Sequence, residues 1–242
     1  MKLNLQTTLI AAAVAAFACG RAYASPRAAE ASGADYLVSA EDLDGFHVGG
    51  YYRYTSREID HGYNSLSQDA FAFILGYDVL GWASVYGIAG VTDAQLDRYD
   101  YGDHDYSFIY GAGAWVNILD HDLISNLSTE TKIRLTATSQ ITFGAPEVYG
   151  DECKYSDFYG AVTLGIVNEL VGNKNLWPDA LGVFVGPVWS VFDCDDLDTT
   201  GEEVGFAFGL DIYVTRRVGI SLSYETYGSD DDAVNFSLNC RF

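Results

Sequence analysis

The chain has 242 residues, a length that suits one domain, and 49% of them are hydrophobic. Its formal net charge is −21. Nucleic-acid binding requires clustered Lys and Arg to neutralise phosphates, so this charge excludes a nucleic-acid partner. No motif implies a cofactor or a dedicated metal site.

Residues 1–24 have the features of a secretory signal peptide. They begin with a positive charge, continue with an unbroken apolar run over 9–18, and end with the small residues Ala22 and Ala24 where a signal peptidase cleaves. The apolar run is about half the ~20 residues that a membrane-spanning helix requires. We therefore expect cleavage after Ala24, followed by a small, polar, acidic leader over 25–44 in the periplasm.

Over residues 45–242, apolar residues recur at every second position in tracts of about ten residues. This period is that of a β-strand with one apolar face, and helical spacing is not sustained anywhere in this stretch. The fold class is therefore all-β. Ten tracts are present, at 46–55, 70–78, 82–91, 106–117, 132–143, 158–167, 182–192, 204–214, 218–227 and 233–242.

Three features favour an antiparallel, closed transmembrane β-barrel over a soluble sandwich. The tracts have the ~9–11 residues that a tilted strand needs to cross a bilayer. Aromatic residues lie near tract ends, where interfacial girdles form, namely Tyr52, Tyr54, Tyr106, Phe108, Phe143, Phe158, Phe192 and Tyr227. The chain also ends on a strand, with Phe242 on its apolar face. We predict ten strands. Eight is the alternative, because the connections 118–131 and 168–181 are long for periplasmic turns.

The last strand, in which Val234, Phe236 and Leu238 alternate with polar residues before the terminal Phe242, resembles the closing strand of bacterial outer-membrane β-barrel proteins. The resemblance covers about residues 45–242 together with the signal peptide. It implies a location in the bacterial outer membrane and contact with its lipid. It also implies that Phe242 is the assembly signal read by the barrel-assembly machinery.

The acidic residues gather in one set of connections. With an even strand count both termini face the periplasm, and alternate connections face outward. The outer set, 57–69, 92–105, 144–157, 193–203 and 228–232, holds 21 acids against three bases. We expect an acidic outer surface at which divalent cations are candidate partners.

Charged and polar residues on the inward face predict a narrow, filled lumen, because barrels of about eight strands are filled and open channels appear near 16 to 18. The inward set is Arg53, Asp78, Lys132, Arg134, Gln140, Asp211, Glu225 and Arg241. A small pore for solutes, lined by Lys132, Arg134 and Arg241, is the functional alternative.

Catalytic and metal sites are weakly indicated. The segments Asp60-His61 and 103–105 (Asp-His-Asp) faintly resemble the Asp and His residues of omptin surface proteases, and Ser107 is the only Ser near a loop His for a lipid-modifying hydrolase. The inward His47 suits neither chemistry. Residues 196–201 resemble the start of a calcium loop, but Ala207 stands where the final Glu is required. We therefore expect no catalytic residue and no specific metal site.

Three cysteines follow the predicted cleavage site. Cys153 and Cys194 lie in outer connections, whereas Cys240 is expected on the lipid face near the opposite end. We predict a disulfide between Cys153 and Cys194, which closes a loop of about 40 residues. Two free thiols are the alternative.

The sequence therefore predicts a non-catalytic integral outer-membrane barrel with acidic surface loops and an envelope-structural or surface-interaction role. The alternatives are a small pore for solutes and an omptin-like or lipid-modifying surface hydrolase.

Overall fold

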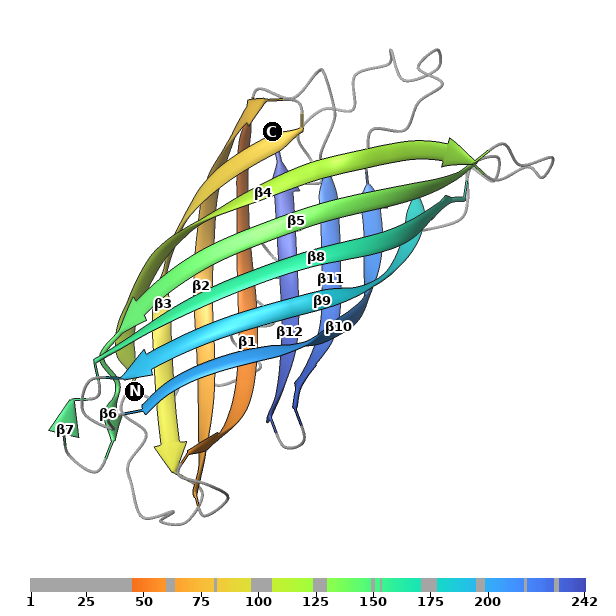
Figure 1. The fold of residues 1–242 in the computed structure, drawn as a ribbon. Helices are drawn as coiled ribbons and strands as arrows, with labels where there is room; N and C mark the ends of the chain where they lie inside the picture. Colours follow the sequence, from red (N-terminus) through yellow and green to blue (C-terminus); the bar gives the residue numbers. More distant parts are fainter. Residues whose placement is uncertain are drawn as a thin grey trace.

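In the computed structural model the chain forms a closed antiparallel barrel of ten strands (Figure 1). The structure describes residues 45–59, 64–80, 82–96, 106–123, 130–148, 151–152, 154–170, 178–194, 199–215, 217–228 and 231–242. Among these residues no helix is long and apolar enough to cross a bilayer. The barrel strands are β1 (Phe46–Ile59), β2 (Asn64–Leu80), β3 (Ala83–Leu96), β4 (Ser107–Leu123), β5 (Glu130–Gly144), β8 (Tyr155–Glu169), β9 (Ala180–Cys194), β10 (Thr199–Thr215), β11 (Val218–Tyr227) and β12 (Asp231–Arg241). The short strands β6 (Glu147–Val148) and β7 (Asp151–Glu152) pair with each other between β5 and β8.

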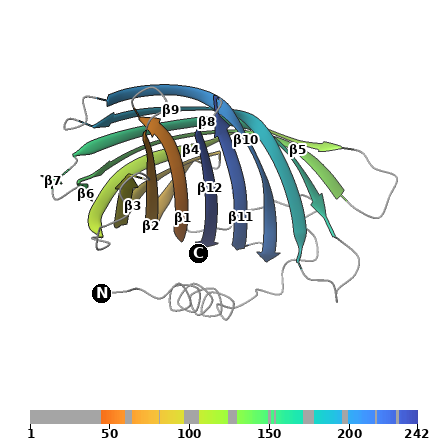
Figure 2. The same ribbon diagram turned by 90° about the horizontal axis from the view of Figure 1, so that it is seen from below.

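The barrel closes where the first strand meets the last. β12 pairs with β1 from His47↔Arg241 to Ser56↔Asp232, and every other barrel strand pairs with its neighbours along the chain. Figure 2 shows the sheet curving around, with β1, β12 and β11 side by side. The Phe242 amide donates to the Phe46 carbonyl over 3.0 Å at the end where the chain enters and leaves the barrel. We call this the terminal end and the opposite one the distal end.

All ten predicted tracts are barrel strands, and the eight-stranded alternative is wrong. The strands are longer than the tracts, since β2 begins six residues before residue 70 and β4 ends six residues after residue 117. The expected connections 118–131 and 168–181 shorten to 124–129 and 170–179. In β2 the added residues have polar outward positions, Ser65, Ser67 and Asp69, so the period of two is not visible there. In β4 the exposed residues Ile118 and Leu119 are adjacent at a β-bulge, which interrupts the period of two.

Three β-bulges lie near the terminal ends of their strands. Pairing shifts between Asp78 and Leu80 in β2, between Asn117 and Leu119 in β4, and between Tyr213 and Thr215 in β10. A bulge adds one residue to one strand and increases the local twist, so it suits the place where a long strand stops pairing. The three bulges therefore lie toward one end of the barrel. Near the middle of the barrel, the β8–β9 pairing is interrupted between Ala161↔Val188 and Leu164↔Val185, next to Pro187, which has no amide hydrogen to donate.

Glycines make room for aromatic rings inside the barrel. A β-carbon at Gly113 would lie 2.3 Å from Cζ of Tyr86, and one at Gly209 would lie 2.3 Å from Cζ of Phe184. No real side chain tolerates such a contact, so these positions require glycine as long as the rings keep their places. The high glycine content thus follows in part from packing large rings into a narrow barrel.

The two faces of the strands have opposite character. Along β9 buried and exposed residues alternate, with Ala180 and Val188 inside and Val183 and Val185 outside. Side chains that point inward fill the lumen, whereas large apolar side chains cover the outer wall. The packed core of this molecule is therefore the polar and aromatic filling of its lumen.

Three residues differ from their expected environment. Phe192 and Tyr227, expected in the aromatic girdles, are buried, and their side chains contact lumen residues. Both point inward, because Phe192 lies two positions after the buried Ser190 on β9 and Tyr227 lies two positions after the buried Glu225 on β11. Cys240, expected to be exposed to lipid, is also buried, since its small side chain lies in register between Val48 and Val218.

Candidate functional site

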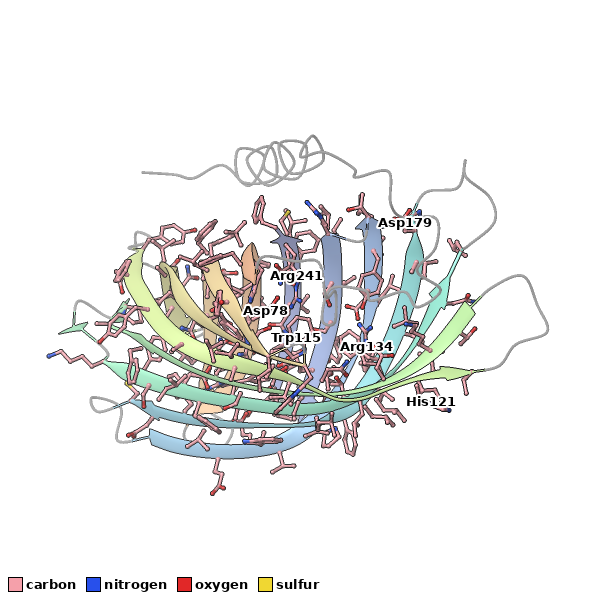
Figure 3. The ribbon with its side chains drawn as sticks, turned by 90° about the horizontal axis from the view of Figure 1, so that it is seen from above. Asp78, Trp115, His121, Arg134, Asp179 and Arg241 are labelled. Carbon is pink, nitrogen blue, oxygen red and sulfur yellow. The ribbon has the colours of Figure 1, made fainter. Side chains whose placement is uncertain are left out.

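The eight side chains predicted to face the lumen lie at three levels along the barrel. Arg53 and Glu225 meet toward the distal end, and Gln140 and Asp211 line a central cavity. The remaining four lie toward the terminal end, namely Asp78, Lys132, Arg134 and Arg241. Figure 3 shows Asp78, Trp115, Arg134 and Arg241 gathered within the barrel, with His121 apart from them.

Glu225 on β11 is the centre of the distal polar network. It is 2% exposed and accepts hydrogen bonds from Arg53 (3.3 Å), Tyr159 (2.9 Å), Tyr227 (2.7 Å) and Asn235 (2.8 Å). These four donors come from four positions on β1, β8, β11 and β12. A buried carboxylate needs such compensation, because an unpaired charge in the interior is strongly destabilising.

A second carboxylate, Asp157 on β8, joins the same network. Its oxygens lie 3.3 Å from Nη2 of Arg57 and 3.9 Å from Nη1 of Arg53, and it accepts a hydrogen bond of 2.9 Å from Ser190. The guanidinium of Arg57 also lies over the Phe192 ring, 4.7 Å from its centroid. In the strand order, β1 and β8 are five strands apart in either direction. These ion pairs therefore cross the full width of the lumen.

We call Arg53, Arg57, Asp157, Ser190 and Glu225 the distal layer. Further polar and aromatic residues pack beside it. The amide of Gln68 donates to Thr92 (3.0 Å) and to Tyr155 (2.7 Å), and the Tyr155 ring stacks on Phe192 at 5.4 Å between centroids. All four of these side chains are less than 9% exposed. The distal part of the lumen is thus filled by side chains from opposite walls.

A second group, the terminal layer, consists of Asp78, Asp120, Lys132, Arg134 and Arg241. Nη1 of Arg241 lies 3.0 Å from Asp78, and Nη2 of Arg134 lies 2.9 Å from Asp120. The Arg241 guanidinium also lies over the Trp115 ring, 5.6 Å from its centroid. The carboxylates of Asp78 and Asp120 are 14% and 19% exposed, more than those of the distal layer. The arginines show the opposite order, with Arg134 and Arg241 at 6% and 1% against 10% and 7% for Arg53 and Arg57.

Between the layers lies a central cavity of about 330 Å³. Aromatic residues form much of its wall, among them Tyr51, Tyr86, Trp115, Tyr159 and Tyr213, together with Ser, Thr, Asn and Gln side chains. A cavity lined by this many polar groups holds water or a ligand, in contrast to an apolar cavity, which stays dry.

Charges are balanced across the two layers and the cavity wall. In this part of the described chain the cations are Arg53, Arg57, Lys132, Arg134 and Arg241, and the anions are Asp78, Asp120, Asp157, Asp211 and Glu225. Each of the four arginines lies within 4.0 Å of a carboxylate. The lumen therefore presents no excess of either sign to a solute.

Several network residues were not recognised in the sequence. Arg57 and Asp157 were placed in outer connections, and Tyr159 and Ser190 were given no role. Arg57 could have been predicted to face the lumen, because it lies four positions after the inward Arg53 on the same strand and side chains alternate between the two faces. For Asp157 the apolar tract begins one residue later, so the period of two did not reach it.

The catalytic candidates are not brought together. Asp60, His61 and residues 103–105 lie outside the described residues. Ser107 has a buried hydroxyl without a hydrogen-bond partner, and neither ring nitrogen of the buried His47 has one. Within the described part of the chain no cluster of three or more His, Cys, Asp or Glu residues is arranged to hold a metal ion. Residues 196–198 of the calcium-like segment lie outside the described residues, and Ala207 is buried.

The outer wall of the barrel carries a continuous set of exposed apolar side chains. It includes Phe73, Leu75, Val85, Phe108, Tyr110, Leu164, Ile166, Val183, Val185, Val204, Phe206, Phe208 and Leu222, each at least 47% exposed. In water this surface would favour aggregation, whereas in a bilayer it meets lipid, and every strand edge is paired by closure of the barrel. The chain is a transmembrane β-barrel.

Solved bacterial outer-membrane barrels are similar to this barrel at low sequence identity. Neisserial surface protein A is 12% identical, with 83% of this chain and 98% of that chain covered and a TM-score of 0.32. The transport unit of the autotransporter AIDA-I from Escherichia coli is 9% identical, with coverages of 96% and 97% and a TM-score of 0.36. The outer membrane protease OmpT from Escherichia coli is 9% identical, with coverages of 83% and 98% and a TM-score of 0.31. No protein-family profile and no curated protein sequence matches the chain.

The cysteines and the terminal residue occupy distinct parts of this transmembrane barrel. Cys194 at the distal end of β9 is disulfide-bonded, and Cys153 lies outside the described residues. Cys240 is not part of a disulfide. Phe242 is 41% exposed at the terminal end, where its amide donates to the Phe46 carbonyl. Its role as an assembly signal and the pairing of Cys153 with Cys194 stay predictions.

Proposed function

We propose that this protein is a non-conducting, non-catalytic outer-membrane barrel that acts through its distal surface, as an envelope-structural or surface-interaction protein. The distal layer is the observation that carries the proposal. Its ion pairs join β1 to β8 across the lumen and join β1 to β11, so solutes meet paired side chains rather than an aqueous path.

The barrel size supports the same proposal. Ten strands enclose an interior close to that of eight-stranded barrels, which side chains fill, and far from that of 16-stranded porins. The alternative of a small pore would need a path past both layers. Arg134 and Arg241, two of the three cations assigned to such a pore, are instead paired with Asp120 and Asp78. We therefore do not propose the pore.

Acidic side chains at the distal ends of the strands give the surface its character. The hydroxyl of Tyr52 donates to Asp69 over 2.5 Å, and that of Tyr224 donates to Asp232 over 3.2 Å. Asp69 also lies directly opposite Asp93 in the β2–β3 ladder. Tyr rings at the lipid interface and carboxylates just beyond it suit contact with lipid headgroups through divalent cations.

Single-channel recording in planar bilayers tests the proposal. We expect no stepwise conductance from the refolded wild-type protein. An Arg53→Ala/Arg57→Ala/Asp157→Ala variant, which removes the side chains that cross the lumen, should produce steps if it folds. The exposed residue Glu202 gives a matched control, since Glu202→Ala should stay silent. Regular conductance steps from the wild-type barrel would overturn the proposal, whatever the variants do.

A further inference from the structure

We infer that the central cavity is a binding site for a small, uncharged, hydroxyl-rich molecule of about monosaccharide size. This goes beyond the proposed function, because a barrel that does not conduct can still hold a ligand between its two layers. The cavity volume of about 330 Å³ lies at the lower end of the ~300–1,000 Å³ typical of small-molecule sites. An oligosaccharide or a lipid is therefore too large.

Accessible polar side chains in the cavity wall indicate a polar ligand. Hydroxyl and amide groups that are only half-buried line the cavity, namely Thr136, Thr138, Gln140, Thr163, Ser221, Ser223, Asn235, Ser237 and Asn239. Hydroxyls both donate and accept hydrogen bonds, and an amide offers two donors and one acceptor oxygen. A ligand that lacked polar groups would leave these side chains unpaired at a cost of about 1–3 kcal/mol each. Both donors and acceptors are present, and a hydroxyl group of the ligand can satisfy either.

The charge balance of the lumen excludes an ionic ligand. Arg53 is neutralised by Glu225 and Asp157, and Arg134 by Asp120. A carboxylate or an ammonium entering the cavity would have to break one of these pairs or bring an unpaired charge into the interior. An uncharged ligand pays neither cost.

The aromatic walls fit the apolar faces of a sugar ring. Tyr86 and Trp115 reach the cavity from β3 and β4, and Tyr51 and Tyr159 from β1 and β8. Flat rings bury the C–H faces of a pyranose, while hydroxyl and amide side chains between them meet its polar edge.

Binding is measured by the fluorescence of Trp115 in the folded, detergent-solubilised protein. The variant Trp82→Phe/Trp177→Phe/Trp189→Phe leaves Trp115 as the only tryptophan. The probes are a set of neutral hexoses and pentoses that includes D-glucose, with glucosamine and gluconate as cationic and anionic analogues of glucose. We expect a saturable fluorescence change with at least one neutral sugar. Its charged analogue should bind about tenfold more weakly, equivalent to 1.4 kcal/mol.

Two substitutions by phenylalanine, at adjacent positions of β5, provide the control. Thr138 lines the cavity, so Thr138→Phe should fill it and weaken binding by about tenfold or more. Ser139 has the opposite parity on the same strand, so Ser139→Phe adds the same ring to the outer wall and should leave binding unchanged. The inference is overturned if no neutral sugar gives a saturable change in Trp115 fluorescence, or if a charged analogue binds more tightly than its neutral sugar. It is also overturned if Thr138→Phe and Ser139→Phe have the same effect on binding. The conductance experiment is independent of these outcomes.

Discussion

Among isosteric substitutions in the distal layer, Glu225→Gln should destabilise the barrel most. The carboxylate is buried and accepts four hydrogen bonds, from Arg53, Tyr159, Tyr227 and Asn235. The amide keeps the shape of the side chain but loses the charge. It also presents two N–H donors to a site where four donors already converge.

The expected magnitude follows from the partner that remains. Breaking a buried ion pair by removing one charge costs about 3–5 kcal/mol. Arg53 retains Asp157 at 3.9 Å, so we expect the lower end, about 3 kcal/mol, for Glu225→Gln. With a urea dependence of about 1–3 kcal/mol per molar, the unfolding midpoint should fall by roughly 1–3 M.

Urea unfolding of the protein in lipid vesicles, followed by tryptophan fluorescence, measures this shift. Glu202→Gln, an exposed change on the neighbouring strand β10, should stay within about 0.5 kcal/mol of wild type. Adding Arg53→Met to Glu225→Gln removes the uncompensated cation and should recover part of the loss. If Glu225→Gln and Glu202→Gln have the same midpoint, Glu225 does not organise the lumen and the reasoning is wrong.

Three further outcomes are expected. Phe242→Asp should reduce assembled barrel in outer-membrane fractions far more than Phe46→Asp, although both rings are exposed at the terminal end; equal losses would indicate a general interfacial effect and no assembly signal. Phe208→Arg, in the middle of β10 on the outer wall, should lower the free energy of unfolding in vesicles by about 2–4 kcal/mol, and an unchanged midpoint would contradict its contact with lipid. Mass spectrometry of the non-reduced protein should find a peptide linking Cys153 to Cys194, whereas alkylation of both without reductant would exclude the bridge.

The alternating pattern was sufficient to predict the strands because a lipid-facing strand must be apolar at every second position. All ten strands were found, including the ambiguous tract at 182–192, where apolar residues occupy both faces. Strand ends were missed because that constraint stops at the headgroups. Beyond them, as in β2 from Asn64 to Asp69, pairing continues although the outward residues Ser65, Ser67 and Asp69 are polar.

The site was predictable only in part for a related reason. The alternation of inward and outward positions along a strand assigns a side chain to the lumen. It does not show which side chain on the opposite wall that residue contacts. Arg53 and Glu225 are 172 positions apart in sequence, and their contact depends on strand order, register and tilt together. Ser190 and Asp157 likewise acquire a shared function only when β8 and β9 are paired.

For the proposed surface role, the strand ends that project beyond the apolar band have a consequence for recognition. A strand of 17 residues such as β2 has a contour of about 55 Å at ~3.3 Å per residue, or about 40 Å of height at a ~45° tilt. The apolar band accounts for about 25 Å, so roughly 15 Å of hydrogen-bonded sheet projects from the lipid. The β1–β2 ladder, paired as far as Ile59↔Asn64, is an example. A partner that docks there contacts side chains held in fixed positions on paired strands ~4.8 Å apart. Its binding therefore carries little entropic cost from ordering a loop.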